Sequence, residues 1–181
     1  MTTLARKPTL RGPHVTLVPI EARHAPEFLA MGDDPDLFRL TGSHIRHDAE
    51  TIHRWCASRA GQPDRLDLAV EDRGTGDFLG ELALLRVDPH NESAAFRIAL
   101  REDRCGKGIG SEAIGLVLGH AFGEVGLHRV WLEVFAFNHR AIRAYEKAGF
   151  VREGVQREAL LWDGVRHDAY LMSVLRRDHD R

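Results

Sequence analysis

Three apolar segments separated by two clusters of turn-forming residues constrain the fold of this chain more than any other feature. The segments Leu66–Glu71, Phe78–Val87 and Ser93–Leu100 have the length and composition of β-strands. Between them lie Arg73–Gly76 and Asp88–Asn91, which are rich in the residue types that form turns. Because short turns join antiparallel neighbours, the sequence predicts an antiparallel meander in the middle of the chain.

Helical and extended patterns alternate on either side of this meander. Further strands are predicted at His14–Ile20, Arg129–Phe135, Val151–Leu161 and Arg166–Leu175, and helices at Ala25–Met31, after the N-cap Asp48, at Ile109–Val125 and at Asn138–Ala148. We expect residues 1–13 to be loosely ordered and Asp36–His47 to be a mobile surface loop. No internal repeat or linker is visible, so residues 1–181 are interpreted as a single domain.

Composition excludes several classes of protein. A chain of 181 residues with 43% hydrophobic residues can bury the core of one ordinary domain. Its 25 Lys and Arg against 27 Asp and Glu give a net charge of −2, which argues against binding to nucleic acid or to an anionic membrane. Two isolated cysteines, Cys56 and Cys105, indicate reduced thiols and a cytoplasmic protein. Neither a signal-peptide core nor an apolar run of roughly 18 residues is present.

A glycine-rich segment, Cys105–Ser111, leads directly into the helix predicted at Ile109–Val125. Its alternate glycines, Gly106, Gly108 and Gly110, let the backbone approach a ligand closely, and the helix N-terminus offers free N–H groups to an anion. The spacing matches neither the dinucleotide fingerprint GxGxxG nor the P-loop GxxxxGK[ST]. The segment therefore indicates a polyphosphate site, and the alternative is a glycine-rich helix start without a ligand.

The segment from Asn138 to Phe150 has the pattern of a well-capped helix. Asn138 is a natural N-cap, and Gly149 suits the residue that ends the helix. Helical spacing places Tyr145 on the apolar face, toward the preceding strand. The tyrosine could carry a proton in catalysis, or it could merely pack in the core.

Together these two segments resemble the GNAT superfamily of acetyl-CoA-dependent N-acetyltransferases. In that family a [Q/R]xxGxG/A loop holds the pyrophosphate of coenzyme A, and a helix of the form NxRAIRxYEKxGF carries the catalytic tyrosine. The resemblance continues at Leu10–Phe28 and Gly164–Arg176 and is closest to the branch that acetylates the N-termini of ribosomal proteins. One departure is Cys105, which stands where the family has Gln or Arg, so Arg104 or Lys107 would have to assist the phosphate.

The resemblance implies an α/β (α+β) fold with a mixed, mostly antiparallel sheet of about seven strands and helices on both faces. The fourth and fifth strands, Ser93–Leu100 and Arg129–Phe135, would splay apart to receive the pantetheine of acetyl-CoA, the implied cosubstrate. The implied cofactor-binding residues are Ile98, Ala99, Leu100, Cys105, Gly106, Lys107, Gly108, Ile109, Gly110, Ser111, Asn138, Arg143 and Tyr145.

The implied activity is direct transfer of the acetyl group to a primary amine. The acceptor could be a protein N-terminus, a polyamine, an amino acid or an aminoglycoside, and the segments 33–47 and 160–167 would shape its pocket. Trp162 could form one wall. A non-catalytic CoA-binding regulator or an interaction protein on the same fold is the alternative function, and a homodimer is compatible with the resemblance.

Acetyl transfer to an amine needs a base for the ammonium proton and an acid for the departing thiolate. Tyr145 is the expected acid, and Asn138 is expected to bind the pantetheine or a water molecule. Many relatives carry a glutamate as base where this chain has Ala95, so we assign the base to Glu81.

Glu81 is expected on a strand face shared with Leu79, Ala83 and Leu85, roughly opposite Ile98. There desolvation would raise the pKa of its carboxyl toward a useful value. An ion pair with Arg97, which a register shift of one residue would allow, and proton loss through a water chain are the alternatives.

No metal site is expected, although the chain has 11 histidines. The densest group, His44, His47 and Asp48, matches no established ligand spacing. Catalysis by a cysteine nucleophile is disfavoured as well, because neither cysteine has a histidine partner close in sequence.

Overall fold

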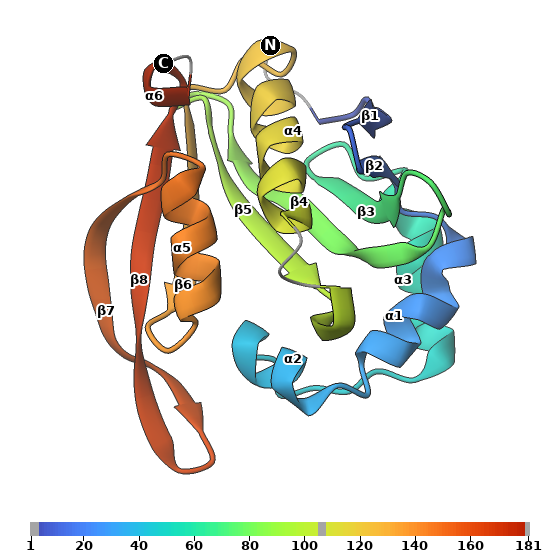
Figure 1. The fold of residues 1–181 in the computed structure, drawn as a ribbon, viewed down its shortest axis with the longest axis horizontal. Helices are drawn as coiled ribbons and strands as arrows, with labels where there is room; N and C mark the ends of the chain where they lie inside the picture. The colour runs from blue at the N-terminus through green and yellow to red at the C-terminus, as the bar shows by residue number, and fades with distance from the viewer. Residues whose placement is uncertain (1–3, 105–107, 180–181) are drawn as a thin grey trace.

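A computed structural model describes residues 4–104 and 108–179, and its centre is one sheet of eight strands (Figure 1). The strands are β1 (Leu10–Arg11), β2 (Val15–Pro19), β3 (Leu66–Asp72), β4 (Phe78–Asp88), β5 (Ser93–Leu100), β6 (Arg129–Phe135), β7 (Val151–Trp162) and β8 (Val165–Leu175). The helices are η1 (Ala22–His24), α1 (Ala25–Met31), α2 (Pro35–Thr41), α3 (Ala49–Arg59), η2 (Glu102–Arg104), α4 (Ile109–Gly123), α5 (His139–Lys147) and α6 (Arg176–His179).

The strand order is β1-β2-β3-β4-β5-β6-β8-β7, and only the β5–β6 pair is parallel. The predicted meander forms β3, β4 and β5. The fold class predicted from the resemblance is confirmed, with the short strand β1 as an addition to the seven that the sequence indicates. Among the described residues, no helix is both long enough and apolar enough to span a bilayer.

Helices cover the two faces of the sheet with two apolar cores of different size. The larger core packs α4 and α5 against strand residues such as Leu82, Phe96 and Leu132. The smaller core packs α1 and α3 against residues that point the other way, such as Ala69 and Ala99. The alternation of side chains along each strand therefore separates two chemical environments.

The N-terminal segment differs from its prediction. Leu4 has only 1% of its surface exposed, and the Lys7 ammonium donates to the backbone carbonyls of Leu4, Gln62 and Arg65. Leu10 then pairs with Leu17 of β2. The expectation of loose order is therefore wrong for residues 4–13, because one buried leucine and one lysine bind this segment to the fold.

The segment Asp36–His47 is not a continuous loop, since its first part belongs to α2. The Asp34 carboxylate caps this helix by accepting from the backbone N–H groups of Asp36 and Leu37, and Pro35 occupies the first turn. Pro35 follows α1, where a proline commonly marks the end of a helix. Proline is equally suited to begin one, and no residue of α2 is fully buried, so the apolar periodicity was weak.

The sheet opens between β5 and β6. In these two strands only Ser93–Ala95 of β5 pair with Arg129–Trp131 of β6. Figure 1 shows the strands diverging beyond that point, with α2 near the open end. β4 supports the unpaired part of β5 from the other side. A Cβ atom at Gly80 of β4 would lie 2.3 Å from the Ala99 carbonyl oxygen, so the two strands approach as closely as glycine alone permits.

Candidate active site

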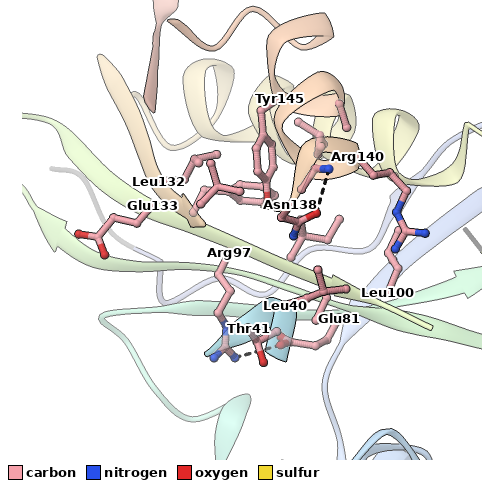
Figure 2. Close-up of a pocket in the computed structure, with 18 of the residues that line it drawn as sticks. Leu40, Thr41, Glu81, Arg97, Leu100, Leu132, Glu133, Asn138, Arg140 and Tyr145 are labelled. Atoms are coloured by element: carbon pink, nitrogen blue, oxygen red, sulfur yellow. Dashed lines mark hydrogen bonds and ion pairs between the residues drawn. The ribbon is translucent and has the colours of Figure 1, made fainter. Parts of the chain in front are cut away.

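A cavity of about 860 Å³ occupies the opening between β5 and β6 (Figure 2). It is lined by residues of β4, β5, β6, α2, α4 and α5. The predicted site residues in its lining are Glu81, Ile98, Ala99, Leu100, Gly108, Gly110, Ser111, Asn138, Arg143 and Tyr145. Ile109 instead packs in the larger apolar core, and Cys105, Gly106 and Lys107 lie outside the described residues.

The glycine-rich end of the cavity is the N-terminus of α4. Gly108 precedes the helix in the left-handed conformation, with φ of 79°, and a Cβ atom there would meet nothing within 4 Å. Gly110 and Ser111 also line the cavity, on the first turn of the helix. Backbone N–H groups and the positive end of the helix dipole therefore face a space that an anion can enter.

A row of cationic side chains on α5 also lines the cavity. Arg140, Arg143 and Lys147 all line it, and their spacing places them along one side of the helix. The Arg140 guanidinium holds the Glu102 carboxylate of η2 at 2.9 and 2.7 Å, and this hydrogen bonding lowers the pKa of Glu102. Sequence reasoning found Arg143 but missed Arg140 and Lys147, although their spacing on the motif helix could have indicated them.

The unpaired edge of β5 forms the middle of the cavity. The backbone N–H of Arg101 points toward β4, where it donates to the Leu79 carbonyl at 2.9 Å. Since successive residues of a strand direct their backbone groups to opposite sides, we infer that Ile98 and Leu100 direct theirs toward the opening. This edge can pair with an extended, amide-containing ligand in the way that a peptide adds to a sheet.

Tyr145 projects from α5 into the larger core and reaches the cavity. Only 6% of its surface is exposed, and its ring packs edge-on against Phe96 and obliquely against Phe150. Burial raises the pKa of the phenol well above its usual value, so the hydroxyl keeps its proton at neutral pH. Figure 2 shows the ring directed toward Asn138, whose side chain caps α5 by accepting from the Ala141 N–H at 3.2 Å.

Glu81 lies across β5 from Tyr145, on the other face of the sheet (Figure 2). It pairs with Ala99 and not with Ile98, so the predicted register was wrong by one residue, and its carboxylate contacts Arg97 at 3.0 Å. Leu79 does not share its face, because an irregularity at the start of β4 turns Leu79 into the larger core. The ion pair considered as an alternative is therefore the arrangement found.

The Glu81 carboxylate is buried, and only one of its two oxygens has a partner. Burial raises its pKa, while the Arg97 guanidinium acts in the opposite direction. One oxygen contacts Arg97, and among the described residues the other oxygen, Oε2, has no hydrogen-bond partner. A buried carboxylate oxygen without a protein partner is a place where a proton or a water molecule is expected.

The end of the cavity near α2 is lined by the first of the two segments predicted to form the acceptor pocket. Leu37, Phe38, Leu40, Thr41 and Ser43 contribute to the lining. The second segment, 160–167, does not line the cavity but contacts the first from outside. The Trp162 ring stacks on His44 with 5.0 Å between ring centres, so Trp162 supports the pocket and is not one of its walls.

Neither a metal site nor a reactive thiol accompanies the cavity in the part of the chain that is described. No group of three or more histidine, cysteine, aspartate or glutamate side chains there could hold a metal ion. Cys56 of α3 is fully buried in the smaller apolar core, and burial raises the pKa of its thiol to about 11. A thiol of that pKa is a poor nucleophile at neutral pH.

Fold and site together define a class: an α/β protein whose sheet opens around a cavity, and the lining includes a helix N-terminus, cationic side chains and buried titratable groups. The Acetyltransferase (GNAT) domain family matches residues 14–151, so the chain belongs to the GNAT acetyltransferases. The "Probable N-acetyltransferase YjcK" of Bacillus subtilis (strain 168) is 40% identical over 95% of this chain and 99% of its own length.

Two further comparisons involve proteins whose names state an acceptor. The spermidine N(1)-acetyltransferase of Vibrio cholerae (serotype O1) is 31% identical over 59% of this chain and 61% of its own length. A crystal structure of spermidine N-acetyltransferase from Vibrio cholerae with CoA and spermine superposes with a TM-score of 0.87, covering 94% of this chain and 100% of that one. At 21% identity this structure supports the fold alone.

Proposed function

We propose that this GNAT acetyltransferase moves the acetyl group of acetyl-CoA directly onto a primary amine while both substrates are bound. The observation that carries the proposal is one continuous cavity. It joins the anion-binding start of α4 to the buried groups Tyr145 and Glu81, which lie on opposite sides of β5. Two substrates can therefore meet in the opening without a covalent intermediate on the protein.

The residues present fit acetyl-CoA, the cosubstrate of the family. Gly108–Ser111 and the cations Arg140, Arg143 and Lys147 suit its phosphates, since they combine helix N–H groups with positive charge. The open edge of β5 at Ile98–Leu100 suits the amides of the pantetheine. The thioester would then lie between Asn138 and β5.

The reaction forms a C–N bond and breaks a C–S bond. The amine loses a proton before or during its attack on the thioester carbonyl, and we assign this proton to the free oxygen of Glu81, directly or through water. The thiolate leaves with the electron pair of the C–S bond and receives a proton from the Tyr145 hydroxyl. As the C–S bond breaks, the nitrogen loses a second proton, which restores the Tyr145 hydroxyl directly or through water. The products are the neutral amide, the neutral thiol and one proton that Glu81 passes to solvent.

An assay of thiol release tests the proposal. Purified chain is mixed with acetyl-CoA and a panel of primary amines, and free CoA and acetylated amine are measured together. Equal amounts of the two products, with no acetyl group left on the protein, are expected. A chain that binds acetyl-CoA but produces neither product with any amine would instead be a CoA-binding regulator.

A further inference from the structure

We infer that the acceptor is a single amine that stands next to a carbonyl or carboxylate oxygen, as in an α-amino acid or a peptide N-terminus, and is not a polyamine. The inference rests on the proposed function and concerns the charges at the acceptor end of the same cavity. Figure 2 shows Glu81 and Arg97 there, close to Leu40 and Thr41 of α2.

Negative charge at this end is scarce. Only two carboxylates line the described cavity, Glu81 and Glu133. One oxygen of Glu81 is engaged by Arg97 at 3.0 Å, and one oxygen of Glu133 accepts from the Gln156 amide at 2.9 Å. The Glu81 carboxylate is therefore the one buried negative charge that the described cavity lining offers to an ammonium group.

Positive charge instead lines the same cavity at two positions. The Arg97 side chain is half exposed, and it reaches into the cavity from β5. Arg86 of β4 also lines the cavity, with its guanidinium 6.0 Å from the centre of the Trp131 ring. The further ammonium groups of a polyamine held at Glu81 would lie close to the Arg97 guanidinium, and like charges a few ångströms apart repel.

Arg97 can serve both parts of an α-amino acceptor. One of its nitrogens holds Glu81, which receives the amine, and a guanidinium offers five N–H donors in a planar fork. The remaining donors can bind an oxygen one carbon away from the amine. The pair therefore complements such an acceptor: the negative charge of Glu81 faces the amine, and the positive charge of Arg97 faces the neighbouring oxygen.

Four acceptors test the inference when kcat/KM is measured for each with saturating acetyl-CoA. They are a tripeptide with a free N-terminus, the amino acid at its first position, butylamine and spermidine. The two α-amino acceptors are expected to exceed butylamine by about tenfold or more, the worth of one hydrogen bond to a charged group, when kcat/KM is expressed per unprotonated amine. This correction is needed because an α-amine titrates at about 8 and an alkyl amine at about 10. The faster of the two identifies whether a peptide or a free amino acid is the source of this chemistry.

The variant Arg97→Gln connects this preference to the residue. Because Arg97 also contacts Glu81, its loss can slow every acceptor, so the decisive quantity is the ratio of kcat/KM for the α-amino acceptor to that for butylamine. This ratio is expected to fall toward one in Arg97→Gln and to recover in part in Arg97→Lys. The matched control Arg157→Gln, at an exposed arginine of β7 outside the cavity lining, should leave the ratio unchanged.

Three outcomes would contradict the inference. A higher kcat/KM for spermidine than for the α-amino acceptors would overturn it and leave the proposed transferase function standing. An unchanged ratio in Arg97→Gln would remove Arg97 from acceptor recognition. No transfer to any amine by a chain that still binds acetyl-CoA would overturn the proposed function and the inference with it.

Discussion

The two ends of the cavity are built in different ways. At the end that we assign to the phosphates of the cofactor, α4 and α5 supply the described groups, and each helix carries its own groups within a few turns of sequence. At the acceptor end, Glu81, Arg97 and the residues of α2 come from three separate elements and meet only when the sheet is paired in one register. Local sequence therefore specifies how the cofactor is held, whereas tertiary pairing specifies what the acceptor meets.

The largest expected effect tests whether Tyr145 belongs to the chemistry or merely to the core. Tyr145→Phe keeps the ring contacts with Phe96 and Phe150 and removes the proton. General acid catalysis contributes about 10²- to 10⁴-fold, so kcat should fall by that factor while the affinity for acetyl-CoA is retained. An undiminished kcat, measured where chemistry limits the rate, would show that Tyr145 packs in the core and does not act as the acid.

The next largest effect tests Glu81 as the base, through the pH dependence of kcat/KM. Burial raises the pKa of Glu81, so a base at this position becomes protonated and loses activity as the pH falls below that raised value. Glu81→Gln should lower kcat/KM by about 10²-fold and abolish this acidic limb. The measurement is the profile of kcat/KM against pH for both proteins, with thermal unfolding to verify that the variant is folded.

A near-normal profile in a folded Glu81→Gln protein would show that the ion pair with Arg97 is structural. The ammonium proton would then leave through water. The acceptor end would in that case provide recognition without catalysis.

A matched pair of variants tests the cofactor end. Gly108 has a positive φ and an empty space where a side chain would point, and both Asp and Asn tolerate this conformation. Like charges 4 Å apart repel by about 1 kcal/mol in water and about 4 kcal/mol near a protein surface. Gly108→Asp should therefore weaken acetyl-CoA binding at least about fivefold relative to Gly108→Asn.

Calorimetric titration of both Gly108 variants gives the two dissociation constants. Equal values would place the phosphates away from the start of α4. The Asn variant also controls for any strain at this position.

The smallest expected effect concerns α2, the helix that the sequence analysis does not predict. Asp34→Ala removes the carboxylate that caps α2, at a cost of about 1 kcal/mol. Since no residue of α2 is fully buried, the loss should appear as faster amide hydrogen exchange in residues 35–41, with little change in the unfolding of the whole protein. Faster exchange throughout the sheet would show instead that α2 is integral to the core.

The same contrast explains what could be predicted from the sequence. The strands, the long helices and the caps Asp48 and Asn138 follow from periodicity and local chemistry, and the structure has both caps in place. The partner of Glu81 could not be fixed in this way. A shift of one residue in a hairpin exchanges opposing partners, and the irregular pairing near Leu79 and between Leu85 and Asp88 carries no clear sequence signal.

Gly80 affects the width of the opening between β5 and β6 although it does not line the cavity. The residue lies behind β5, outside the cavity, yet the distance between β4 and β5 depends on its lacking a side chain. Even a methyl group would displace the strand whose far edge borders the opening and would narrow it without altering any lining residue. The width of the opening therefore depends on a residue that does not contact the ligand. Substitution of Gly80 during evolution would change the size of the ligand that the opening admits.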